Sequence, residues 1–209
     1  MDGKTSSTNR MNTNGINGAQ GYFAMRTFIA IELPEAVRKK LVGLIAALRR
    51  GSVRASWVRS DHMHLTLRFL GEITDDHLEV INPALLEACV NTPSFALGVH
   101  GLGAFPNLRR PSVLWVGVGP LQPALADLQR ASEAAARSAG LASETKPFHP
   151  HVTLARIKDP RSAGGLTGEV EAQRDFGAGA FDVTHVSLFS SELTPRGPIY
   201  TRIQEYPLK

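Results

Sequence analysis

His64-Leu65-Thr66-Leu67 is the stretch from which the architecture follows, and it comes again 87 positions later as His151-Val152-Thr153-Leu154. Both copies alternate polar with apolar residues, which is typical of a half-buried strand. Successive side chains of a strand point to opposite faces. The histidine and threonine of each copy therefore share one face, while the two apolar residues share the other. We expect two strands that each present an imidazole beside a hydroxyl, with both pairs facing one cleft.

A strand, a helix and the first motif strand follow one another in the first third of the sequence. Residues 26–32 alternate as a strand, and apolar residues at helical spacing after Pro34 predict a helix. The first motif strand, 63–70, should end at Gly71. Thr74 is a suitable cap for a helix over 75–90, in which Pro83 should cause a kink or a restart.

The rest of the chain has a similar order around the second motif. Strands are predicted at 95–100 and 112–118, joined by a loop over 101–111. A helix over 121–139 should turn Leu121, Leu125 and Leu128 inward. The second motif strand at 150–157 precedes a long Gly-rich loop at 158–179 and two final strands, near 180–190 and 199–206. We therefore predict an α+β fold of two pseudo-symmetric lobes of antiparallel sheet, with helices on the outer faces and an active-site cleft between the lobes.

Composition limits the class of protein. The 209 residues carry a net charge of +4, which weakly favours an anionic partner. Cys89 is the single cysteine, so no intramolecular disulfide can form, and no apolar run is long enough to span a bilayer. We expect a cytoplasmic monomer that does not bind membranes. Residues 1–24 lack periodicity and predict a flexible tail, leaving 25–209 as one bilobal domain.

Two imidazoles suit proton transfer near neutral pH, because one can be a neutral base while the other is a protonated acid. A hydroxyl two residues along each strand can donate a hydrogen bond to an anionic oxygen. This set is suited to hydrolysis of a phosphodiester and needs no nucleophilic side chain. Glycine-rich phosphate-binding motifs and the Gly-x-Ser-x-Gly motif are absent from the sequence.

The paired motifs resemble those of the 2H phosphoesterase superfamily, and more narrowly its RNA 2′,3′-cyclic phosphodiesterases, also called 2′-5′ RNA ligases. The resemblance extends over about 25–206 and includes these segments: Arg26–Ile31, His64–Glu72, Phe105-Pro106, Leu114–Gly117, Pro150–Arg156, Ser191 and Gly197–Tyr200.

By motif position, the resemblance implies that His64 is the proton donor, that His151 is the proton acceptor, and that Thr66 and Thr153 bind phosphate. Arg156 matches a basic position of the family, but it would share the face of His151 only if the strand were bent or bulged. The resemblance also implies RNA 2′,3′-cyclic phosphate ends or nucleoside 2′,3′-cyclic phosphates as substrates, 2′-5′ ligation as a related activity, and no metal or cofactor.

Other interpretations of these residues remain open. His62 and His149 precede the motif histidines by two positions, so four imidazoles could bind a metal in a phosphohydrolase. A non-catalytic RNA-binding protein is a further alternative. Arg68 could reach the cleft or remain in solvent. Phe148 and Trp115 could stack on a base or pack in the core.

Overall fold

A computed structural model of the chain describes residues 24–49, 54–159, 166–195 and 197–209, so the expected tail lies almost wholly outside the described residues. The strands are β1 Met25–Glu32, β2 Ser56–Trp57, β3 His64–Ile73, β4 Phe95–Phe105, β5 Val113–Gly119, β6 His151–Arg156, β7 Gly177–Val183, β8 His185–Thr194 and β9 Gly197–Pro207. The helices are α1 Glu35–Leu48, α2 Asp75–Val90, α3 Pro123–Ser138 and α4 Leu166–Ala172, and a short 3-10 helix, η1, spans Ser60–His62.

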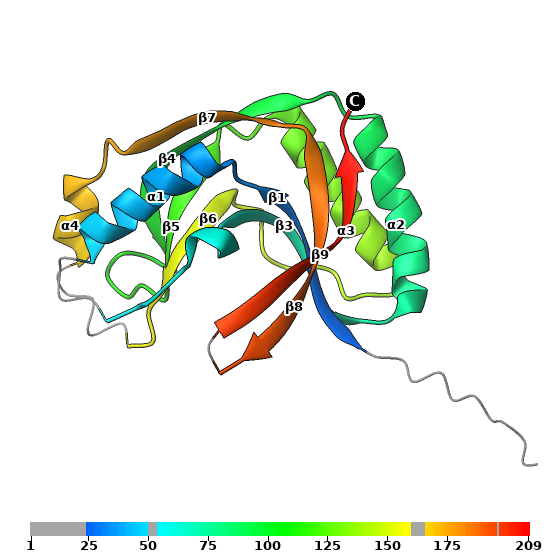
Figure 1. Cartoon of the computed structure of the whole chain (residues 1–209), viewed down its shortest axis with the longest axis horizontal. Coiled ribbons are helices and arrows are strands. Elements are labelled where there is room, and N and C mark those ends of the chain that lie inside the picture. Colours follow the sequence, from blue (N-terminus) through cyan, green and yellow to red (C-terminus); the bar gives the residue numbers. More distant parts are fainter. Residues whose placement is uncertain (1–23, 50–53, 160–165, 196) are drawn as a thin grey trace, which may run out of the picture.

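The nine strands within the described ranges form one curled sheet in the order β7-β4-β5-β6-β3-β1-β8-β9, with β2 paired to β6 (Figure 1). The motif strands β3 and β6 are neighbours at its centre, with three strands of the main order on either side. Helices α2 and α3 pack together near β3 and β9, whereas α1 contacts β7, η1 and α4. The pair α1 and α4 and the pair α2 and α3 lie at opposite ends of the molecule. The predicted α+β fold of two lobes is confirmed.

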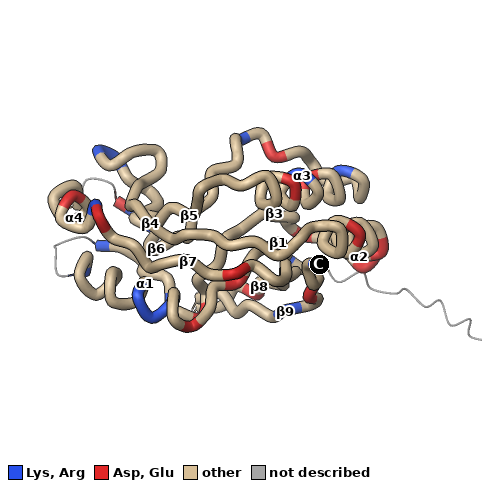
Figure 2. The backbone as a smooth tube through the Cα atoms, turned by 90° about the horizontal axis from the view of Figure 1, so that it is seen from above, with Lys and Arg blue, Asp and Glu red and all other residues tan. Residues whose placement is uncertain are grey.

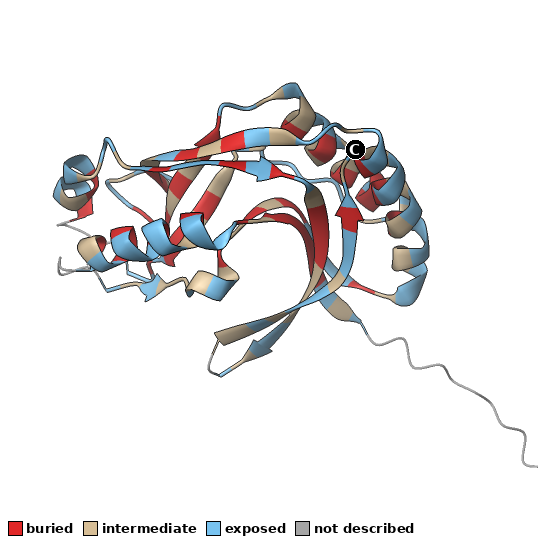
Figure 3. Cartoon of the chain, turned by 45° about the horizontal axis from the view of Figure 1, so that its top comes forward, coloured by how far each residue is buried: buried red, intermediate tan, exposed pale blue. Residues whose placement is uncertain are grey.

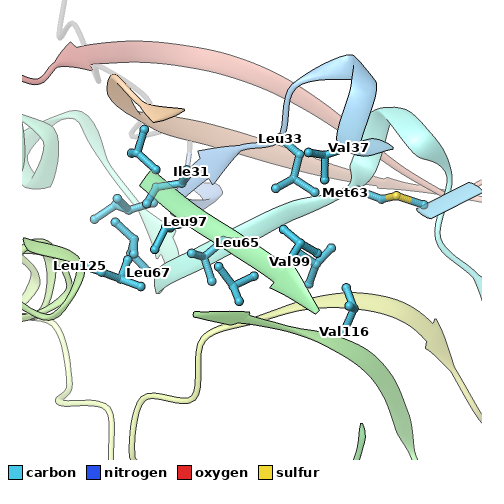
Figure 4. Close-up of a cluster of buried hydrophobic side chains, with 14 of the residues drawn as sticks. Ile31, Leu33, Val37, Met63, Leu65, Leu67, Leu97, Val99, Val116 and Leu125 are labelled. Atoms are coloured by element: carbon cyan, nitrogen blue, oxygen red, sulfur yellow. The ribbon is translucent and has the colours of Figure 1, made fainter. Parts of the chain in front are cut away.

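The core lies behind the motif strands, on the side of their apolar residues. Leu65, Leu67, Val152 and Leu154 are at most 3% exposed. Figure 4 shows Leu65 and Leu67 packed among side chains from β1, β4, β5 and α3. Figure 3 shows buried positions concentrated on the sheet and on the inner sides of the helices. Strands β4 and β5 carry no Lys, Arg, Asp or Glu, and charged positions gather toward the helices and the outer strands (Figure 2).

Several predicted boundaries are wrong, because strands continue where glycine suggested an end. Strand β3 runs on to Ile73, and Gly71, with φ of +76°, lies at an irregularity in its register with β1. Strand β4 continues to Phe105 because Gly101, with φ of +71°, also sits at a register shift and not at a turn. The loop expected over 101–111 is therefore reduced to the connection at 106–112.

Other differences concern helices and the end of the chain. Leu121 is 53% exposed because α3 begins only at Pro123, whereas Leu125 and Leu128 are buried as predicted. Helix α2 does not restart at Pro83, since its buried residues hold both halves against the core. The expected loop at 158–179 contains α4 and the start of β7, and its residues 160–165 lie outside the described part. The end of the chain forms three strands, β7, β8 and β9, where two were predicted, because Thr184 separates β7 from β8.

Candidate active site

The two motifs meet where β3 and β6 pair. Leu65 is the antiparallel partner of Val152. This register brings His64 opposite Thr153 and Thr66 opposite His151, with all four side chains on one face of the sheet. Each of the four is half-buried. The predicted motif residues therefore lie together at the junction of the lobes.

A β-bulge follows the threonine in each motif. The register of β3 against β1 skips Leu67, and that of β6 against β5 skips Leu154. An extra residue reverses the alternation of side chains beyond it. Arg156 therefore lies on the same face as His151, and its side chain is exposed. Phe69, which is 50% exposed, takes the equivalent position on β3.

Arg68 is turned to the opposite face by the bulge, so both readings of this residue from the sequence are wrong. It is 8% exposed, and its Nε forms an ion pair of 2.5 Å with Oε2 of Glu133 on α3. Its guanidinium also donates hydrogen bonds to the carbonyl oxygens of Phe69 and Ala142. The ion pair of Arg68 with Glu133 therefore links β3 to α3.

Aromatic rings enclose His64 on the first lobe. The ring of Phe28 stacks on the imidazole with 4.6 Å between centroids, and Tyr200 of β9 meets it edge-on at 5.5 Å. Tyr200 also lies 4.7 Å from the ring of His62. These contacts shield one side of the imidazole from water and restrict its orientation.

The second lobe repeats this arrangement with other residues. Phe105 meets the ring of His151 edge-on at 5.0 Å, and Trp115 lies 6.2 Å from it. Trp115 also packs edge-on against His149 at 4.7 Å. It therefore forms a wall of the site, while Phe148 is partly buried against the core.

Each motif histidine forms a hydrogen bond to the backbone two residues earlier. Nδ1 of His151 lies 2.6 Å from the carbonyl oxygen of His149, and His64 bonds the backbone of His62. A carbonyl oxygen only accepts, so Nδ1 of His151 carries a hydrogen and Nε2 of the neutral ring can exchange a proton with a substrate. The His-x-His pattern thus supplies backbone acceptors.

Burial lowers the pKa of His64 to about 4. The bond to His62 and the carboxylate of Glu32 raise this pKa, whereas the charges of His62 and His151 lower it. Burial also lowers the pKa of His151, and the charge of Arg156 acts in the same direction. The two motif histidines therefore respond to nearby charge, and both favour the neutral form in the free protein.

A cavity of about 310 Å³ opens beside His64, and its walls include Phe28, Glu32, Tyr200 and Arg202. Burial raises the pKa of Tyr200, while the charges of Arg156 and Arg26 lower it. Arg156 of one lobe thus acts on a tyrosine of the other lobe. The first lobe therefore contributes a cavity to the site, and the second contributes a cation whose charge acts on Tyr200 in the wall of that cavity.

Sequence reasoning assigned no role to Glu32 or Tyr200. Tyr200 lies 136 positions from His64, and only the sheet order brings them together. Glu32 ends β1 on the face of Phe28, but only the pairing of β1 with β3 brings it beside His64.

The four histidines of the two His-x-His patterns do not gather as a metal site. Among the described residues, the group whose potential ligand atoms lie within 4.8 Å of one another is Glu32, His185 and Glu205. The metal site predicted as an alternative from His62 and His149 is therefore not formed by this geometry.

The family model of the 2′-5′ RNA ligase superfamily matches residues 34–195. The chain belongs to this superfamily of 2H phosphoesterases, which is a family of enzymes.

Two curated relatives carry the name RNA 2′,3′-cyclic phosphodiesterase. The protein of Aeropyrum pernix is 37% identical, over 79% of this chain and 95% of its own length. That of Thermotoga maritima is 35% identical, over 87% of this chain and 94% of its own length. The crystal structure of Escherichia coli LigT complexed with 3′-AMP is similar with a TM-score of 0.72 and 25% identity, covering 89% of this chain and 99% of LigT. Within the described ranges, none of the helices is long and apolar enough to cross a membrane.

Proposed function

We propose that this chain hydrolyses the 2′,3′-cyclic phosphate ends of RNA to 2′-phosphate ends, using two histidines and no metal ion. The observation that carries the proposal is the convergence of His64, Thr66, His151 and Thr153 on one face where β3 meets β6. The activity named for the relatives supports the same substrate.

In the proposed reaction His151 takes a proton from water, and the water oxygen forms a bond to phosphorus. The bond from phosphorus to O3′ breaks, and His64 gives its proton to O3′. The donor role of His64 rests on the family resemblance. Each proton transfer contributes roughly 10²–10⁴-fold to the rate.

Three further side chains bind the phosphate in this proposal. Thr66 and Thr153 donate hydrogen bonds to its non-bridging oxygens. Arg156, returned to this face by the bulge, balances its negative charge. Positively charged side chains also favour the approach of RNA ends.

The unit of function is one chain, since both motifs come from the same sheet, and residues 25–209 form its single domain. A 5′-hydroxyl of a second RNA in place of water would attack the same phosphorus and expel the same O3′. That reaction and its reverse would make and break a 2′-5′ linkage, so ligation is proposed as a secondary activity of the same site.

Substitution of the motif residues tests the assignment. His64→Ala and His151→Ala should each lower kcat on a nucleoside 2′,3′-cyclic phosphate by at least about 10²-fold, because each removes one proton-transfer partner. Thr66→Val and Thr153→Val should raise the barrier by about 1–3 kcal/mol through a lost hydrogen bond. His62→Ala and His149→Ala are matched controls that keep the backbone acceptors and should have mild effects. Near-wild-type turnover in either motif-histidine variant would remove that residue from the mechanism.

Chelation separates this proposal from a metal-dependent phosphohydrolase. Turnover should persist in EDTA, whereas a loss that zinc or manganese restores would support the metal mechanism. The variant that lacks both motif histidines distinguishes the RNA-binding alternative. If it bound RNA normally and the wild type showed no turnover, the chain would be a binding protein.

A further inference from the structure

Glu32 is the centre of a polar network that joins β1, β8 and β9. Its Oε2 accepts hydrogen bonds from Oγ of Ser187 at 2.9 Å and from Nη1 of Arg202 at 3.1 Å, and it lies 3.4 Å from Nε2 of His185. The same Nη1 of Arg202 lies 2.6 Å from Oε2 of Glu205. The carboxylate of Glu32 is thereby held in one orientation.

This fixed carboxylate lies beside His64. Glu32 is the antiparallel partner of His64 between β1 and β3. Directly opposed residues of such a pair share one face of the sheet, with Cβ atoms about 4.5–5.5 Å apart. Both side chains also line the cavity at the first motif. A charge on Glu32 therefore acts on the imidazole at short range.

The network carries an excess of negative charge. It contains the two carboxylates of Glu32 and Glu205 and one guanidinium, that of Arg202, so its sum is one negative charge when His185 is neutral. Glu32, His185 and Glu205 also lie close enough to hold a metal ion. Arg202 already binds both carboxylates, however, and supplies the cation that they require.

Other charged groups around His64 act in both directions. Arg38, Asp61 and Arg202 line the same cavity. His62 lies two residues before His64 in the sequence, and His151 lies diagonally from His64 on the paired strand β6. Burial opposes a positive charge on the imidazole, although the proposed donor must carry one. Glu32 is the carboxylate on the neighbouring strand that offsets this penalty.

We propose that Glu32 is a positioning residue that retains the proton on His64 until it is transferred to the leaving oxygen, with Arg202 setting how much of the Glu32 charge reaches the imidazole. The inference rests on the proposed role of His64 as proton donor. A purely structural role of the network is the competing explanation, because its contacts also join three strands.

Two substitutions that break the same ion pair separate the explanations. Glu32→Gln removes the negative charge, so kcat/KM should fall about tenfold on the alkaline side of the pH profile and remain unchanged at its acid end. Arg202→Gln leaves Glu32 uncompensated, so the alkaline side should rise relative to the acid end. Loss of a structural contact would lower both variants alike at every pH, and that result would overturn the inference. Glu79 is an exposed carboxylate on α2. Glu79→Gln is therefore the charge-matched control and should leave the pH profile unchanged.

Titration of the imidazole by NMR gives a readout besides activity. The Cε1–H signal of His64, assigned by its absence in His64→Ala, should titrate about one pH unit lower in Glu32→Gln and higher in Arg202→Gln. Glu32→Asp should restore part of the shift. Unchanged titration in both variants would overturn the inference. Failure of the wild type to open a cyclic phosphate would instead overturn the proposed function, while the titration would still measure the coupling of Glu32 to His64.

Discussion

At the scale of single residues, burial and catalysis make opposite demands on His64. Its pKa of about 4 and the lowered pKa of His151 leave both rings neutral in the free protein at pH 7. The productive form needs one ring protonated, so its population falls as the pH rises above both values. An anionic phosphate in the site would raise both pKa values.

The profile of kcat/KM against pH should therefore be bell-shaped, with its optimum below pH 6.5, because the pKa of His64 is about 4 and that of His151 is lowered from its ordinary value of 6.5. The two apparent pKa values that define the limbs of this profile belong to the coupled pair of histidines and not to either residue alone. The optimum of kcat should lie at higher pH, since bound phosphate stabilises the imidazolium. Initial rates measured from pH 4 to 9 check both statements. A rate that rises steadily through pH 9 would contradict an imidazolium acid.

For single residues, the sequence is most informative about the site at the two positions where the histidine and threonine of the motif repeat. The two His-x-Thr-Leu motifs identify the histidines and threonines that the sheet later brings together, because strand parity is a local property. Glu32 and Tyr200 depend on the pairing of β1 and on the distant strand β9, and no local pattern contains that information. Their roles follow only from the tertiary structure.

At the scale of secondary-structure elements, the second lobe depends on the close approach of β4 and β5. Gly103 is the partner of Trp115 in this pair. A Cβ on Gly103 would lie 2.2 Å from Cζ2 of the indole ring, which is far inside contact distance. The glycine therefore leaves room for the ring that packs against His149 and His151.

Gly103→Ala should displace the indole, destabilise the protein by about 1–3 kcal/mol through overpacking, and lower turnover by moving the wall beside His151. Urea denaturation and initial rates measure the two effects. Gly43→Ala is the matched control, because a Cβ there meets nothing within 4 Å. In this exposed position of α1 it should stabilise the protein by about 0.5–1 kcal/mol. Equal behaviour of the two variants would contradict the packing argument.

The helices and strands are well predicted from periodicity, and the buried stripe of α1 is an example. The bulges at Leu67 and Leu154 are not, because an extra residue in a strand leaves no mark in the hydrophobic pattern before the partner strand is known. For the same reason Arg68 was expected at the cleft or in solvent, and its ion pair with Glu133 was not foreseen.

At the scale of the whole molecule, one sheet runs through both lobes, and its centre is the junction of the motif strands. The two tryptophans, Trp57 and Trp115, lie on β2 and β5 in the same lobe. Their fluorescence therefore reports on that lobe, while far-UV circular dichroism reports on the whole chain. The two signals should give coincident urea transitions if both lobes unfold as a single unit. Separate midpoints would show that the lobes are independent domains.

Phosphorus NMR of the product formed from a nucleoside 2′,3′-cyclic phosphate in EDTA tests the proposed mechanism most directly. The cyclic ester offers two leaving oxygens of similar chemistry, and a site with one acid and one base can protonate only the oxygen that faces the acid. In-line attack then fixes the water on the side of the base. With His64 as donor to O3′, the expected product is the 2′-phosphate alone. A clean 3′-phosphate would reverse the assignment, a mixture would show that the cleft does not fix the ring, and an unchanged substrate would contradict the proposed function.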